Sequence, residues 1–539
     1  MFKMKNRSII YLLLIVCYTG QLFGQPYGIS KEFHKDRRSE LRNKMPYNTV
    51  AVLFSAPIHN RANDVDFIYH QDPNFYYLTG WSEPHAVLVI YKTPQTDEKG
   101  TYDEVLYVRE RNVREELWNG KRKGVAGALA MDFDRVKDRK EFTPVEDAYA
   151  NYDRVFIFDF KNDVRDFEND VNDLYDLQQR FKTSIHFPNN FDRTRYQLYQ
   201  EIQTVSESET SRLKKRIQWA MEKDPSLSED VLISAFLQAD HQDVFQELKM
   251  KTSFEHRAFN FDVEQLTEYM TELREIKSAE EIALLRKAIR ISAQGQIEVM
   301  KAIHPEMTER EVQGIHQFVY KKYGAAHEGY PSIVGAGHNA CVLHYITNDK
   351  KDIENQLILM DLGAEYEGYT ADVTRTIPVS GRFTEPQREL YQIVYDAQIA
   401  GIEKARVGGT FRDITNACYQ VVKEGLMELG IIENPSEFRR YLPHGVSHHI
   451  GLDVHDPGKY ESLEENMVIT VEPGIYIPEN SPCDKKYWDI GIRIEDDILI
   501  TANGPITVSD EAPRKWDKIE AMMEQSSPLD DFKLPEIED

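Results

Sequence analysis

At 539 residues, the chain is too long for one ordinary hydrophobic core, so at least two domains are expected. Its formal charge of −25 argues against nucleic acid or an anionic membrane surface as a partner. Hydrophobic residues make up 41% and charged residues 29%, which favours a globular, soluble chain over most of its length.

The first 24 residues have the pattern of a secretory signal peptide. Three basic residues precede an apolar run over residues 9–17, and the small Gly24 follows. We expect cleavage after Gly24 and a periplasmic or secreted protein. A membrane anchor is the rival interpretation, but the run is too short to span comfortably. A lipoprotein site at Cys17 is less favoured because the branched Val16 precedes it. No later stretch is long and apolar enough to cross a membrane.

Residues 25–265 are expected to form a first domain of α/β type with a helical insertion. The charged stretch 31–44 predicts a helix. Short β-rich runs alternate with charged, helix-prone stretches, which indicates an α/β arrangement. These runs lie at residues 49–54, 86–91, 104–108 and 155–158. Residues 195–265 are rich in Gln, Glu, Lys and Leu, and they predict helices leading to a domain boundary.

Residues 270–510 are expected to form a second domain of α+β type. Capping boxes at Ser278–Glu281 and Thr308–Glu311 predict two helix starts. Two further helices are predicted at 386–405 and 412–429. The strand-like runs are 333–335, 341–345, 356–362, 369–378, 468–471 and 491–500. Together these elements predict two helix pairs around one antiparallel sheet. Residues 511–539 predict a tail that is poorly ordered at its end.

The cysteines form neither a disulfide framework nor a metal-binding CxxC pattern. Cys17 leaves with the signal peptide, and Cys341, Cys418 and Cys483 are widely spaced. The sequence leaves open whether two of these three cysteines form a disulfide. Burial as small apolar residues is the favoured interpretation for Cys341 and Cys418.

Two aspartates are predicted to lie side by side in the second domain. An apolar run ends at Asp361, and Glu367-Gly368 reads as a two-residue hairpin turn. With that turn as the centre, Asp361 lies opposite Thr374 and shares a sheet face with Asp372. Carboxylates so close repel each other unless a cation or a proton lies between them, and a divalent metal ion is the simplest answer.

Three further segments contribute hard metal ligands. They supply His448 in the run HGVSHHIGLDVHD, Glu472 before Pro-Gly, and Glu495 in the run GIRIED. In a strand, Arg493 shares a face with Glu495, so its cation is expected to orient that carboxylate. Four carboxylates and one imidazole suit Mn²⁺, Zn²⁺, Co²⁺ or Fe²⁺, and they are too many for one small ion. Two ions with shared carboxylates explain the set.

Each of these residues alone has an ordinary structural explanation. An aspartate at a strand end is usually a cap or turn residue, and a glutamate before Pro-Gly is usually part of a turn. The pair His327-Glu328 is rejected as a zincin motif because the second histidine is missing. Five hard ligands from independent motifs are much harder to explain without a metal site.

At these residues the chain resembles the pita-bread metallopeptidases, in particular the Xaa-Pro aminopeptidase (aminopeptidase P) and prolidase branch of family M24B. The resemblance covers most of the mature chain. In the second domain it also includes the runs 332–337 and 343–345. In the first domain it includes Arg37-Arg38 and the runs 71–84 and 115–120. It implies a C-terminal pita-bread (creatinase/aminopeptidase-like) catalytic domain after an α/β N-terminal domain.

The resemblance also implies roles for single residues. Asp361 would hold one metal ion, and Asp372 and Glu495 would bridge two. His448 and Glu472 would complete the other ion, with Glu472 also moving a proton. The remaining positions would line the substrate site or support it: His344 and His455 near the scissile peptide, with His444, Tyr476 and Arg493 as substrate-binding candidates. For His444 and Tyr476, a loop hydrogen bond or plain packing is the alternative.

The resulting hypothesis is a metal-dependent hydrolase that releases the N-terminal residue in front of a proline. Two divalent ions per subunit, with Mn²⁺ favoured, and a homodimer or homotetramer are what the resemblance implies. A prolidase that cleaves only Xaa-Pro dipeptides is the nearest alternative. A methionine aminopeptidase is less favoured because the first domain would be superfluous. A metal-free binding module and a creatinase-like enzyme predict the loss of metal ligands, and all five are present.

Overall fold

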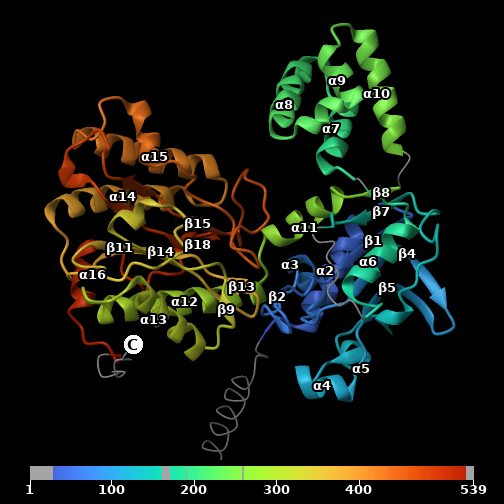
Figure 1. Cartoon of the computed structure of the whole chain (residues 1–539), viewed down its shortest axis with the longest axis horizontal. Coiled ribbons are helices and arrows are strands. Elements are labelled where there is room, and N and C mark those ends of the chain that lie inside the picture. The colour runs from blue at the N-terminus through green and yellow to red at the C-terminus, as the bar shows by residue number, and fades with distance from the viewer. Residues whose placement is uncertain (1–27, 161–169, 190, 258–259, 530–539) are drawn as a thin grey trace, which may run out of the picture. The chain divides into compact units, whose positions relative to one another are not determined.

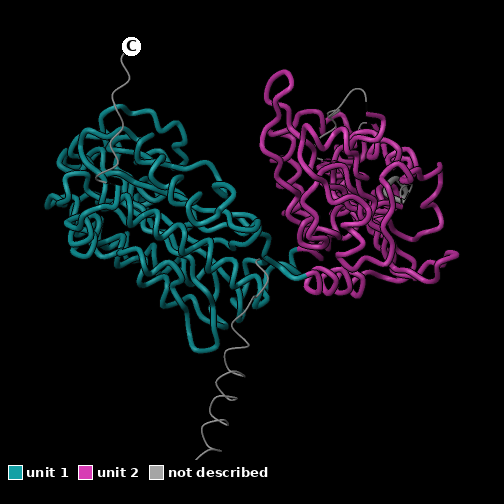
Figure 2. Tube along the Cα trace, turned by 90° about the horizontal axis from the view of Figure 1, so that it is seen from below, with its two compact units in different colours: residues 1–30, 271–539 teal, residues 31–270 magenta. Residues whose placement is uncertain are grey.

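The computed structural model describes residues 28–160, 170–189, 191–257 and 260–529, and the predicted signal peptide lies outside these ranges. The chain divides into two compact units (Figure 2). One is Lys31–Met270, and the other takes the described residues of Met1–Ser30 and Thr271–Asp539. Among the described residues, no helix has both the length and the apolar character that crossing a membrane requires.

The unit Lys31–Met270 is built on a mixed six-stranded sheet with the order β6-β5-β4-β1-β7-β8. The predicted helix and strands are confirmed. The strands are β1 (Thr49–Phe54), β4 (Val87–Asp97), β5 (Gly100–Val108), β6 (Arg135–Asp138), β7 (Arg154–Ile157) and β8 (Phe261–Asp262), besides the hairpin β2 (Asn60–Ala62) and β3 (Val65–Asp66). The helices around them are α2 (Lys31–Lys44), α3 (Pro73–Thr79), α4 (Val113–Asn119), α5 (Gly124–Leu129) and α6 (Leu174–Ser184). Helix α11 (Gln265–Glu275) begins in this unit and ends in the other. The valines of β1 and β4 share one buried hydrophobic cluster with Phe181 of α6, and this cluster is the core of the sheet.

The helical insertion has a core of its own. Its helices are α7 (Arg193–Thr204), α8 (Thr210–Lys223), α9 (Val231–Gln238) and α10 (Gln242–Arg257). Leu198, Leu213, Ile217 and Phe236 meet between these helices and are buried. The helices predicted from residue 195 onward are therefore confirmed.

The unit that contains the expected catalytic residues has two helix layers with strands between them (Figure 1). One layer is α12 (Ala279–Ala302) with α13 (Glu309–Lys322), and the other is α14 (Glu385–Lys404) with α15 (Phe411–Glu428). Capping boxes at Ser278 and Thr308 open the first two helices, as predicted. The apolar faces of these helices pack on the strands in one large core.

The strands of this unit form several short ladders rather than the single sheet that the sequence predicts. Their orders are β10-β11-β14, β13-β12-β9, β15-β18-β19 and β16-β17. The strands are β9 (His327–Glu328), β10 (Ile333–Ala336), β11 (Leu357–Leu362), β12 (Ala364–Tyr366), β13 (Tyr369–Thr370), β14 (Val373–Pro378), β15 (Val468–Val471), β16 (Gly474–Ile477), β17 (Ile490–Arg493), β18 (Asp496–Thr501) and β19 (Gly504–Thr507). The predicted strand 491–500 is interrupted because Ile494 N–H donates to Pro473 O and Glu495 N–H donates to Thr374 O.

Two other predictions differ from the structure. The run 341–345 is not a strand, since a 3₁₀ helix (Gly337–Cys341) and a loop occupy this region. Beyond the expected boundary at 510, the compact unit continues through helix α16 (Trp516–Met523), whose Ile519 is buried in the main core. Arg375 also donates hydrogen bonds to the carbonyls of Ala512 and Pro513, which ties this segment to β14.

Candidate metal centre

The hairpin that carries the two aspartates has the predicted register. Tyr366 pairs with Tyr369 across the turn, and Asp361 pairs with Thr374. Both turn residues, Glu367 (φ 51°) and Gly368 (φ 84°), have positive φ, as a type I′ turn requires. Asp361 and Asp372 are therefore neighbours, and both lie within 2.6 Å of one hydroxyl, that of Tyr330.

Glu472 and Glu495 reach the same place from other ladders. Glu472 follows β15 directly, and Glu495 lies at the break between β17 and β18. Thr374 Oγ1 donates to Glu495 Oε2 over 2.6 Å, which links this carboxylate to the aspartate hairpin. Four carboxylates from separate strands thus meet in the middle of the unit.

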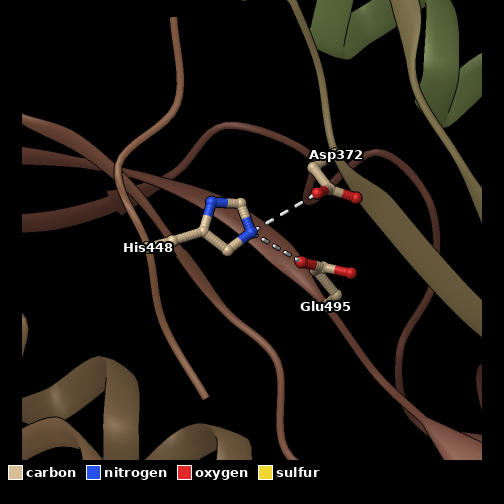
Figure 3. Close-up of side chains that lie close together, drawn as sticks. All are labelled: Asp372, His448 and Glu495. Atoms are coloured by element: carbon tan, nitrogen blue, oxygen red, sulfur yellow. Dashed lines mark ion pairs between the residues drawn. The ribbon is translucent and has the colours of Figure 1, made fainter. Parts of the chain in front are cut away.

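His448 points its Nε2 atom at these carboxylates. Its Nδ1 lies 2.9 Å from the carbonyl of His449, so Nδ1 carries the proton and Nε2 presents a lone pair. Nε2 lies 3.5 Å from Asp372 Oδ2 and 4.0 Å from Glu495 Oε1 (Figure 3). It also lies 3.5 Å from Glu472 Oε1. One ligand atom from each of Asp372, His448 and Glu495 lies within 4.8 Å of the others.

The electrostatics of this cluster favour a divalent cation between the carboxylates. Burial and the neighbouring aspartates raise the pKa of Asp372 well above its usual range, and burial with Asp372 does the same for Glu495. Burial also raises the pKa of Glu472 to about 7. Burial would raise the pKa of Asp361 too, but Arg493 and the Tyr330 hydroxyl hold it below its usual value. Carboxylate oxygens and an imidazole nitrogen that face one another are a donor set for divalent cations, so the residues present fit such ions.

Arg493 does not make the contact that the sequence predicts. Its ion pair is with Asp361 Oδ2 at 2.5 Å rather than with Glu495, because the strand breaks directly after Arg493. Its other guanidinium nitrogen donates to Tyr476 Oη over 2.9 Å, and that oxygen lies 2.9 Å from His444 Nε2. Arg493, Tyr476 and His444 therefore form a chain of hydrogen bonds that starts at a ligand candidate.

His344 and His455 line the cavity above the carboxylates. This cavity has a volume of about 740 Å³, and the carboxylates, His448, His444 and Arg493 also line it. Both His344 and His455 are exposed, and the His455 ring lies with its centroid 4.4 Å from that of His448. They are free to meet a ligand that enters the cavity, whereas Asp361, Asp372 and Glu495 are buried and Glu472 is partly buried.

Tyr330 and Thr374 are site residues that the sequence reasoning missed. Thr374 could have been found, because the predicted register already places it opposite Asp361. Tyr330 lies between Gly329 and Pro331 outside any regular element, so no periodicity marks it. Burial of its hydroxyl, which needs a polar partner, is visible only in the folded chain.

Comparison with known proteins gives matches to two family models. Residues 283–502 match the model described as "Metallopeptidase family M24", and residues 34–156 match "Aminopeptidase P, N-terminal domain". A Xaa-Pro aminopeptidase of Escherichia coli (strain K12) is 31% identical over 507 residues, which are 92% of this chain and 98% of that protein. Xaa-Pro aminopeptidase 3 of Homo sapiens is 29% identical over 500 residues, covering 91% of this chain and 84% of the relative.

Solved structures give the same picture. Aminopeptidase PepP of Pseudomonas aeruginosa superimposes with a TM-score of 0.72 at 29% identity, covering 92% of this chain and 99% of that one. Aminopeptidase P from E. coli with the inhibitor Pro-Leu gives a TM-score of 0.71 at 29% identity, covering 92% and 98%. The likeness therefore extends over both compact units and is not confined to the candidate metal centre.

Proposed function

The chain belongs to metallopeptidase family M24, among the Xaa-Pro aminopeptidases, and from this premise we propose that it hydrolyses the bond between an N-terminal residue and a following proline. One observation carries the proposal: five hard ligands from four segments line one cavity. The alternative of a prolidase is not favoured, since relatives matched along 92% of the chain are named Xaa-Pro aminopeptidases.

We propose that the ligands are Asp361, Asp372, His448, Glu472 and Glu495, that they hold two divalent ions, and that Mn²⁺ is the resident metal. The number of carboxylates supports two ions, and the oxygen-rich donor set supports Mn²⁺ before Zn²⁺, Co²⁺ or Fe²⁺. Such ions make a coordinated water acidic enough to supply a nucleophile near neutral pH.

The chain's own residues carry the remaining steps of the proposed mechanism. Glu472 takes a proton, at a carboxylate oxygen, from the water that attacks the carbonyl carbon. It passes this proton to the proline nitrogen, which has no N–H in the substrate, as the C–N bond breaks. His455 and His344 donate hydrogen bonds to the carbonyl oxygen as negative charge develops there. The Arg493–Tyr476–His444 chain holds Asp361 and the cavity wall in place.

The test is a comparison of Xaa-Pro dipeptides with longer Xaa-Pro-Yaa peptides. The protein is stripped of metal and reloaded with Mn²⁺, and Glu495→Ala serves as the inactive blank. Metal-dependent release of the first residue from the longer peptides is the expected result. Cleavage of dipeptides alone would indicate a prolidase, and cleavage of neither would overturn the proline specificity. Reloading with Zn²⁺, Co²⁺ and Fe²⁺ in parallel decides which metal supports the highest rate.

We also propose that the chain is exported, loses residues 1–24 and works as a homo-oligomer. The basic, apolar and small pattern of the first residues supports export, and the assembly habit implied by the family resemblance supports oligomers. Intact-mass analysis of protein from the extracytoplasmic fraction should give a chain that begins at Gln25. Light scattering of the same sample should give a mass of two or four chains, and a monomer would contradict the second proposal.

A further inference from the structure

We propose that two buried glutamines, Gln296 and Gln398, are positioning residues that fix the spacing of the four carboxylates in the metal centre. They come from opposite helix layers, α12 and α14, and both are completely buried. The inference rests on the proposed metal centre and concerns how the chain holds its ligands before any metal ion binds.

Gln296 ties together the two strands that carry the aspartates. Its Nε2 donates to Met360 O over 3.0 Å and to Val373 O over 2.8 Å. Met360 directly precedes Asp361, and Val373 directly follows Asp372. One amide group therefore holds the backbone next to both aspartates, in addition to the ladder between β11 and β14.

Gln398 makes the corresponding contacts at the two glutamates. Its Nε2 donates to Val471 O over 3.1 Å and to Asp496 Oδ2 over 2.9 Å. Val471 directly precedes Glu472, Asp496 directly follows Glu495, and the two are paired between β15 and β18. Each of the four carboxylates thus has a neighbour in sequence that one of the two glutamines anchors.

The chemistry of the contacts fixes how each amide is turned. All four partners are acceptors, so only the NH₂ end of each glutamine can face them. The Gln398 oxygen accepts from Arg514 Nη1 at 3.4 Å, which agrees with this orientation. The Gln296 oxygen, by contrast, has no hydrogen-bond partner in the described part of the chain.

Packing alone would favour an apolar residue over a glutamine at such a position. A buried, unpaired amide oxygen destabilises the folded chain, and a leucine or methionine on the apolar stripe of α12 would avoid that cost. The two donated bonds are therefore the reason for a polar side chain here. Since metal–ligand distances must hold to within about 0.2 Å, a fixed spacing of the strands matters for affinity.

The experiment replaces each glutamine by methionine, which keeps the length and removes the donors. In metal-stripped protein, we expect Gln296→Met and Gln398→Met each to weaken Mn²⁺ binding by about 10- to 100-fold in titration calorimetry, the range typical of residues that support metal ligands. Gln294→Met on the same helix is the matched control, because Gln294 bonds only to Glu298 among the described contacts. It should bind Mn²⁺ like the wild type.

A second control separates positioning from general destabilisation. Val422→Ala opens a cavity in the same core and removes no hydrogen bond to a strand, so it should lower the Tm of the metal-free protein and leave the Mn²⁺ affinity unchanged. The inference is overturned if both methionine variants bind Mn²⁺ as the wild type does. It is also overturned if their loss of affinity is no larger than that of Val422→Ala at a matched fall in Tm.

The two glutamines lie in opposite helix layers, so each variant provides an independent test if the other does not fold. The rise in Tm on adding Mn²⁺ gives a second measure of affinity for a weakened variant. Wild-type protein that binds no Mn²⁺, Zn²⁺ or Co²⁺ would overturn the proposed metal centre and this inference with it. If the wild type and the variants all bind metal equally well, the positioning inference fails and the proposed metal centre stands.

Discussion

Tyr330 serves two ligand candidates with one hydroxyl. Its Oη lies 2.6 Å from Asp361 Oδ1 and 2.6 Å from Asp372 Oδ1, and burial together with these aspartates keeps its pKa well above the usual range. Tyr330→Phe removes both contacts and nothing else. Because the hydroxyl contacts two ligand oxygens, we expect kcat to fall about 10-fold with little change in KM.

Steady-state kinetics on a Xaa-Pro-Yaa peptide check this prediction. Tyr391→Phe is the control, since Tyr391 bonds to Arg514 O away from the cavity, and it should keep the wild-type kcat. An unchanged kcat in Tyr330→Phe would show that the aspartates hold their places without the hydroxyl. A rise in KM alone would show that the hydroxyl contacts substrate.

Some contacts of single residues were predictable from the sequence and others were not. The pairing of Asp361 with Thr374 followed from a hairpin turn and the two-residue period of a strand, and it is confirmed. The partner of Arg493 was predicted wrongly, because the same period fails where Glu495 N–H bonds to Thr374 O on another strand. The two-residue period of a strand predicts contacts within one ladder. A change of partner strand between two ladders depends on tertiary packing, which the period does not contain.

Among the strands, Gly363 lies close to the backbone of the opposite side of the aspartate hairpin. A Cβ at this position would lie 1.9 Å from Ala371 O and 2.7 Å from the Tyr330 ring. Gly363→Ala must therefore push β11 and the segment before Asp372 apart. We expect a loss of more than about 1 kcal/mol in the free energy of unfolding, together with weaker Mn²⁺ binding.

Urea unfolding of the metal-free protein measures the change in the free energy of unfolding, and titration calorimetry measures Mn²⁺ binding. Gly314→Ala is the matched control because Gly314 lies in α13 with nothing within 4 Å of an added Cβ. Removing a helical glycine should stabilise that variant by up to about 1 kcal/mol. Equal effects of the two substitutions would contradict the argument from crowding.

The segment after β10 illustrates why one strand prediction was wrong. Residues 341–345 are β-branched, aromatic or apolar enough to favour a strand, yet the segment from 337 is held as a 3₁₀ helix and a loop. Buried Glu309, at the start of α13, accepts hydrogen bonds from Asn339, Tyr345 and the Lys350 N–H. Four helices were predictable from their own caps and periodicity, whereas this loop depends on a carboxylate that belongs to one of those helices.

Because that loop carries His344, the Glu309 contacts have a functional consequence. Glu309→Gln puts an amide NH₂ against groups that already donate, so the loop should loosen while the metal ligands stay in place. We expect KM for Xaa-Pro-Yaa peptides to rise several-fold with full Mn²⁺ binding retained. Steady-state kinetics measure KM, and titration calorimetry measures Mn²⁺ binding. Glu306→Gln, at an exposed glutamate, is the control. Loss of Mn²⁺ binding in Glu309→Gln would refute this separation.

Over the whole molecule, each compact unit contains a histidine that folding keeps neutral. Burial, together with Arg139 and Arg109, lowers the pKa of His85 to about 3 in the unit Lys31–Met270. Burial alone lowers the pKa of His316 to about 3 in the other unit. No sequence rule marks either residue, since a histidine titrates in its usual range until tertiary packing removes it from water.

The sign of the resulting pH dependence follows from these pKa values. The unfolded chain binds a proton at His316 near pH 6.5, and the folded chain binds it only near pH 3, so stability present above pH 6.5 is lost as the pH falls. Between pH 7 and pH 5, one such histidine costs about 2 kcal/mol. His316→Leu should therefore lose less stability over this interval than the wild type, by about that amount. Urea unfolding of the metal-free wild type and of metal-free His316→Leu at pH 7, 6 and 5 gives the difference between their free energies of unfolding. The contributions of the other titrating groups, which both proteins share, cancel in this difference. His304→Leu, at an exposed histidine, should follow the wild-type curve, and a His316→Leu curve parallel to it would mean that His316 is protonated in the folded chain.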